Sequence, residues 1–138
     1  MLQKPCFVVL ALLALGCGSE PFQRGTVNGQ VTFDGQPIAT GTIVFIPTHT
    51  GPGASASGEI VAGKFSIPRK TGPSLGSHRV EVLAMRDNGK KEAGSPYPPG
   101  TMVDDIEQYI PARYNHQSEL KADVKSGTPA INFELKPQ

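Results

Sequence analysis

The sequence is poor in cysteine, which limits the covalent chemistry open to it. Its 138 residues include only two, Cys6 and Cys17. Cys6 lies in an apolar N-terminal segment, so the remainder of the chain has Cys17 alone and no disulfide can form within it. A domain of this length can bury enough surface to fold without disulfides.

An excess of charge of one sign is also missing. Lys and Arg together number 13 and Asp and Glu 12, which gives a net charge of +1, and aromatic residues make up 7% of the chain. The densest basic runs are the pairs Arg69-Lys70 and Lys90-Lys91. Nucleic-acid-binding domains carry a clustered basic surface. We therefore expect no nucleic-acid partner.

Long hydrophobic runs are absent as well. The longest, residues 7–15, follows Lys4 and is too short for a membrane-spanning helix, which takes about 20 apolar residues. A cationic start, a short apolar stretch and small residues at its end are typical of a secretory signal peptide. We predict that residues 1–16 are such a peptide and are removed.

The end of this segment, Leu13-Ala14-Leu15-Gly16-Cys17, resembles the bacterial lipobox. The resemblance implies that the Cys17 thiol receives a diacylglyceryl group and that cleavage occurs just before it. Residues 17–25 would then form a lipidated tether, and Gly18 in place of an Asp favours the outer membrane. The alternative is an ordinary signal peptide followed by a chance cysteine.

From residue 26 onward, apolar and polar residues alternate with the period of two that indicates β-strands. Turn signals such as Asp34-Gly35 and Ala62-Gly63 separate the strands. The pattern predicts one all-β domain over residues 26–138, a sandwich of seven strands. The expected strands are residues 26–33, 42–46, 57–61, 64–68, 78–84, 119–125 and 130–135.

Residues 86–117 show no sustained alternation and contain four prolines, so we predict a long loop. Residues 103–110 are compatible with a helical turn within it. Tyrosine is a good contact residue, and three tyrosines in this segment are candidate binding residues unless they pack on their own domain. Three nearby acids are candidate cation ligands, or a solvated turn. The tyrosines are Tyr97, Tyr109 and Tyr114, and the acids are Asp104, Asp105 and Glu107.

Several segments together resemble the bacterial carboxypeptidase-regulatory-like, or transthyretin-like, domain. They are residues 27–38 (VNGQVTFDGQPI), 41–47 (GTIVFIP), 63–65, 76–82 (GSHRVEV), 110–115 and 133–135. The resemblance implies a seven-stranded Greek-key β-sandwich that serves as an accessory domain and not as a catalyst. His78 departs from the family pattern, which often has Tyr at this position.

The chain shows no catalytic constellation. Hydroxyisourate hydrolases, the catalytic relatives of this fold, end in a Tyr-Arg-Gly-Ser-like tail, whereas this chain ends at residues 133–138 as FELKPQ. His49, His78 and His116 do not share one element, so no zinc site is indicated. We expect His78 to be a half-buried packing residue with a satisfied ring nitrogen, and the other two to be solvated in loops. We expect neither enzymatic activity nor a cofactor.

These observations predict a non-catalytic, lipid-anchored protein of the cell envelope with a binding or structural β-sandwich module. Its partners would be the membrane, through the anchor, and an envelope protein or glycan. One alternative is an accessory subunit of an envelope protease or transporter. Another is a weak hydrolase of transthyretin-like type that uses His78 or His116.

Overall fold

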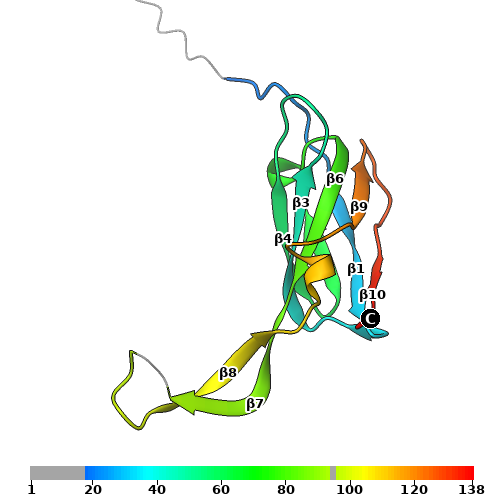
Figure 1. Cartoon of the computed structure of the whole chain (residues 1–138). Coiled ribbons are helices and arrows are strands. Elements are labelled where there is room, and N and C mark those ends of the chain that lie inside the picture. Colours follow the sequence, from blue (N-terminus) through cyan, green and yellow to red (C-terminus); the bar gives the residue numbers. More distant parts are fainter. Residues whose placement is uncertain (1–17, 94–95) are drawn as a thin grey trace, which may run out of the picture.

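A computed structural model describes residues 18–93 and 96–138 (Figure 1). The predicted signal peptide and Cys17 therefore lie outside the described residues. The described chain contains two short 3-10 helices, Arg69–Thr71 and Ala112–Tyr114, and no helix in this part is long and apolar enough to span a membrane. The strands are β1 (Val27–Phe33), β2 (Gln36–Pro37), β3 (Thr40–Pro47), β4 (Ala56–Val61), β5 (Lys64–Ile67), β6 (Gly76–Leu83), β7 (Met85–Ala93), β8 (Met102–Gln108), β9 (Lys121–Val124) and β10 (Phe133–Leu135).

Eight of these strands form one curled sheet that makes up the body of the molecule. The strand order is β10-β1-β5-β4-β3-β6-β9, and β2 pairs with β1 outside this path. All pairs are antiparallel except β1 with β10, which run parallel. The all-β prediction is confirmed, and each of the seven expected strands corresponds to a strand of this sheet.

Two tight turns explain why neighbouring strands pair where they do. Asp34 and Gly35 link β1 to β2 with φ angles of 51° and 77°, and Ala62 and Gly63 link β4 to β5 with 49° and 77°. Two successive residues with positive φ match the right-handed twist of the strands they join. Glycine adopts such angles at little cost, which accounts for its place in both turns.

The core lies on the inner face of the curled sheet. In β6 the alternating residues Val80 and Val82 are fully buried, and Ala84 continues the row just beyond the strand. Phe45 of β3 packs against Phe65 of β5, with ring centroids 6.0 Å apart. Burial of this inner face is what fixes the register of the strands.

The prediction of a loop over residues 86–117 is wrong for the two stretches that form strands β7 and β8. β7 and β8 pair as an antiparallel hairpin that projects from the end of the body (Figure 1). Residues 103–108 are accordingly extended and form no helical turn. Both faces of a projecting hairpin meet solvent, so neither needs the apolar alternation by which half-buried strands are recognised.

The predicted tether is shorter than residues 17–25, because its last residues are fixed to the body. The Leu75 amide donates to the Gln23 carbonyl at 2.9 Å, and the Gly25 amide donates to the Pro73 carbonyl at 2.9 Å. Arg24 also donates from its guanidinium to the Gly72 carbonyl at 2.8 Å. Only residues 18–22 of the described tether lie beyond these bonds.

Candidate functional site

The β7–β8 hairpin, residues 85–108, is the candidate functional site and is called the arm below. β6 runs almost directly into β7, with Ala84 between them. The Ala84 amide donates to the side-chain oxygen of Gln108 at 3.0 Å, and the Tyr109 amide donates to the Ala84 carbonyl at 3.2 Å. Both polar backbone groups of Ala84 are thus bonded to the returning chain, which fixes the root of the arm.

One face of the arm carries three exposed apolar side chains beside the Lys91–Asp104 ion pair. Residues directly opposite each other in an antiparallel pair share a face, and Met85, Asp87 and Ala93 lie opposite Gln108, Ile106 and Met102. The side chains of Met85, Met102 and Ile106 therefore project from the same side of the hairpin, and they are 54%, 54% and 51% exposed. We call these three residues the apolar face.

The opposite face of the arm carries paired polar groups. Arg86 donates from Nε to Glu107 at 2.9 Å, and Asn88 donates to Asp105. The Arg86 guanidinium also lies over the Tyr109 ring, 5.0 Å from its centroid. These contacts hold the two strands together from one side, and the Lys91–Asp104 ion pair links them on the other.

A bulge and a row of acids protect the two edges of the arm. The strand register shifts between Asp87 and Lys91, where Gly89 has a φ of 76°. The Asp87 carboxylate accepts the Gly89 amide at 2.8 Å, which closes the bulge. On the other strand, three of the seven residues of β8 are acidic. Bulges and charges disfavour the addition of a further strand, so the faces of the arm are its available surfaces.

The three acids proposed as cation ligands do not converge. Asp104 pairs with Lys91 on the side of the apolar face, whereas Asp105 and Glu107 point to the other side. The hydrogen bond with Asp104 raises the pKa of Lys91. Each carboxylate has a partner on β7, and nowhere in residues 18–93 and 96–138 do three or more His, Cys, Asp or Glu gather as a metal site. The acids act instead as cross-strand partners.

The three candidate tyrosines have different surroundings. Tyr109 packs edge-on against Phe33, with ring centroids 5.6 Å apart. The Tyr114 hydroxyl accepts the Lys136 amide at 3.0 Å, and its ring lies under the Arg113 guanidinium. Both therefore pack on their own domain, the alternative considered for them. Tyr97 is exposed in the connection between β7 and β8.

Two of the three histidines lie close together in the structure, which the sequence did not reveal. The rings of His49 and His78 lie 6.2 Å apart, although they belong to a loop and to β6. His78 is 1% exposed and therefore more deeply buried than expected. Its Nδ1 has a partner in the Gly76 carbonyl at 2.9 Å, but its Nε2 has none among the described residues, so the prediction of a satisfied ring nitrogen holds for Nδ1 only. His116 is exposed, as expected.

Exposed large apolar side chains gather on and beside the arm. Among the exposed large apolar side chains in the described part of the chain, Leu83 lies just before the root of the arm, and only Val61 lies elsewhere on the body. Leu83, Met85, Thr42 and Glu59 line a shallow groove where the arm meets the body. Clustered apolar surface of this kind marks interaction sites. The arm members are Met85, Tyr97, Met102 and Ile106.

The fold and site define the chain as an all-β protein with a projecting hairpin. Comparison with protein-family models, with characterised proteins and with solved structures finds no match for the chain.

Proposed function

We propose that the chain is a non-catalytic, lipid-anchored protein of the bacterial cell envelope and that its arm binds another envelope protein. The observation that carries this proposal is the apolar face, three large exposed side chains on one side of a hairpin that is clamped to the body. A hairpin without a covering layer is marginally stable by itself. Contact with a partner would bury this face.

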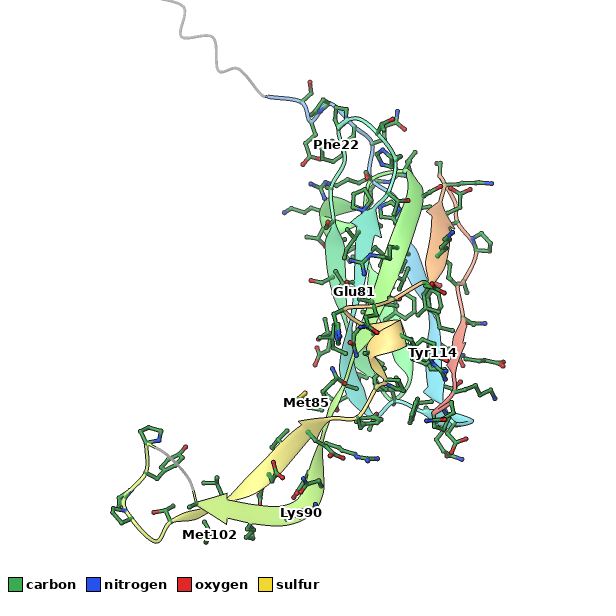
Figure 2. The ribbon with its side chains drawn as sticks, viewed as in Figure 1. Phe22, Glu81, Met85, Lys90, Met102 and Tyr114 are labelled. Carbon is green, nitrogen blue, oxygen red and sulfur yellow. The ribbon has the colours of Figure 1, made fainter. Side chains whose placement is uncertain are left out.

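The positions of the N-terminal segment and the arm support this assignment. Figure 2 shows Met85, Lys90 and Met102 on the arm and Phe22 at the opposite end of the molecule. An anchor at Cys17 would hold the end with Phe22 near the membrane, because Gln23 is already bonded to the body. The arm would then point away from that membrane, toward other components of the envelope.

The chemistry of the arm favours a protein partner with an apolar patch and a basic rim. Methionine is flexible and polarizable, so it adapts to irregular apolar surfaces. The arm carries three basic and five acidic residues. Its charge is therefore negative overall, which suits a positively charged rim around the apolar contact. An accessory subunit of an envelope protease or transporter would use the same face.

A photo-crosslinking residue placed at Met102 in the full chain, expressed in its own cells, tests the arm. Val61 provides a matched control, since it is 55% exposed on the body while Met102 is 54% exposed. We expect one crosslinked product of defined mass from position 102 and none from position 61. The product should disappear when Ile106→Lys is added. Equal products from both positions would contradict the proposal, and a diffuse ladder of masses would point to a glycan instead.

The anchor has its own test, independent of the arm. Mass spectrometry of protein extracted from membranes should find an N-terminus at Cys17 that carries a diacylglyceryl group. Cys17→Ser should release the protein from the membrane fraction, whereas Cys6→Ser should not, because Cys6 belongs to the removed segment. An unmodified N-terminus at any other residue would contradict the lipid anchor.

A further inference from the structure

A small polar cluster lies beneath the N-terminal segment, away from the arm. It contains His49 from the loop after β3, Ser74 from the segment before β6, and His78 from β6. Ser74 is buried, and its Oγ lies 3.4 Å from Nε2 of His49. The Ser74 amide donates to the Ala54 carbonyl at 3.1 Å, which joins this segment to the loop that carries His49.

Backbone carbonyls decide which ring nitrogens carry protons. The Gly76 carbonyl lies 2.9 Å from Nδ1 of His78, and the Thr50 carbonyl lies 3.4 Å from Nδ1 of His49. A carbonyl can only accept, so the bond at 2.9 Å places the proton of the neutral His78 ring on Nδ1 and a lone pair on Nε2, and the longer contact of His49 favours the same arrangement. Histidines that bind metals are commonly oriented in this way, with the other ring nitrogen held by a carbonyl.

The lone pair of His78 has no donor to satisfy it. Its Nε2 is buried and lacks a hydrogen-bond partner in the described structure. The Ser74 hydroxyl has one proton, and the Ala54 carbonyl and Nε2 of His49 already lie within reach of it at 3.5 Å and 3.4 Å. A buried acceptor without a partner calls for an explanation, such as a ligand that is not part of the chain.

The ring of His49 lies in a slot that two glycines make possible. A Cβ at Gly53 would lie 2.9 Å from Cε1 of His49, and a Cβ at Gly76 would lie 2.9 Å from its Cδ2. Gly76 also has a φ of 118°, a conformation that other residues rarely adopt. The backbone on both sides therefore positions this imidazole beside His78.

We propose that His49 and His78 bind one transition-metal ion through their Nε2 atoms. Imidazole nitrogens suit zinc, copper, nickel and iron, and Cu²⁺ is the most tightly bound of the divalent ions in this series. With two nitrogens from the protein, oxygens complete the coordination, and the Ser74 hydroxyl, the Ala54 carbonyl and water are the donors at hand. We expect Cu²⁺ to bind more tightly than Zn²⁺.

The surroundings of His78 lower the pKa of its imidazole. Burial lowers the pKa of His78 and a charge on His49 lowers it further, while the Gly76 and Ala54 carbonyls and Asp123 oppose this shift. The net lowering of its pKa favours the neutral imidazole, which is the form that binds a metal ion.

The test uses the full chain in detergent with Cys6→Ser and Cys17→Ser, which removes the thiols as competing ligands. Titration with CuCl₂ and separately with ZnSO₄ should show one ion per chain, with nitrogen hyperfine structure in the Cu²⁺ resonance spectrum. His49→Ala should weaken Cu²⁺ binding at least tenfold. His116→Ala is the matched control, since this exposed histidine should leave the affinity unchanged.

Three outcomes would overturn the proposal. They are the absence of binding at one ion per chain, an affinity that His49→Ala leaves within twofold of the starting protein, and an equal loss in His116→Ala. His49→Ala alters a loop residue, and its unfolding midpoint should confirm that the fold persists. Because both cysteines are replaced, the result does not depend on lipidation or on the arm.

Discussion

Gln108 and Ala84 join the arm to the body at its root, where the Ala84 amide donates a hydrogen bond of 3.0 Å to the Gln108 side-chain oxygen. The same oxygen accepts the Ile110 amide at 3.1 Å. One side chain thus satisfies two backbone donors at the point where the curled sheet ends and the hairpin begins. This side chain therefore contributes to fixing the direction in which the arm leaves the body.

Gln108→Ala should loosen the arm without unfolding the body. Both amides would lose their acceptor, and a donor left without a partner costs about 1–3 kcal/mol where water cannot replace it. Hydrogen exchange should accelerate at the amides of Ala84 and Ile110, while that of Val82 stays slow. The exposed Gln117→Ala is the control and should change neither. Unaltered exchange at Ala84 would show that Gln108 does not hold the root.

Gly29→Ala should destabilise the body severely. A Cβ at Gly29 would lie 1.7 Å from the Ile131 carbonyl oxygen, an overlap with backbone that no rotamer change can relieve. That approach allows the Ile131 amide to reach the Asn28 carbonyl at 2.9 Å, just before β10 joins β1. We expect a loss of more than about 3 kcal/mol in the free energy of unfolding, measured by denaturant titration.

Gly18→Ala provides the control for this substitution, because a Cβ at Gly18 would meet nothing within 4 Å. The two variants remove the same residue type and differ only in what surrounds it. A Gly29→Ala protein as stable as Gly18→Ala would mean that the segment around Ile131 does not pack against β1 as described.

Ser118→Ala should cost about 1–3 kcal/mol of stability, the penalty for backbone groups left without partners. The buried Ser118 hydroxyl donates to the Val80 carbonyl and accepts the Leu120 amide at 3.2 Å. It therefore connects β6 to the segment that leads into β9. Thermal unfolding measures the loss, and the exposed Ser126→Ala should be neutral. Equal midpoints for the two variants would argue against this bridge.

The sequence predicts the body well because its strands bury one face. Val80 and Val82 alternate with Arg79 and Glu81, and the hydrophobic effect turns that alternation into an inner and an outer surface. Asp34-Gly35 and Ala62-Gly63 mark turns for a reason equally local, their positive φ angles. Such features do not depend on residues far away in the chain.

The arm and the histidine pair depend on such distant residues and were missed. Strands β7 and β8 face solvent on both sides, so their pairing relies on matches such as Arg86 with Glu107, which lie 21 positions apart. His49 and His78 meet only because β3 and β6 are neighbours in the sheet.

Acidification should destabilise the protein through His78. Burial lowers the pKa of this imidazole below its usual value of 6.5, so the unfolded chain binds a proton at pH values where the folded chain does not. Stability then rises with pH through that interval and is fully present above about pH 6.5. As the pH falls below 6.5 toward the lower pKa of the folded state, the free energy of unfolding should drop by up to about 1.4 kcal/mol per pH unit.

His78→Phe separates this effect from other titrations. Phenylalanine keeps a ring against Phe45, whose centroid lies 6.4 Å from that of His78, and it cannot take up a proton. The variant should lose much of the pH dependence between pH 6.5 and 5 in urea titrations, whereas His116→Ala should retain it. If His78→Phe and the parent protein showed the same slope, another group would be responsible for the acid sensitivity.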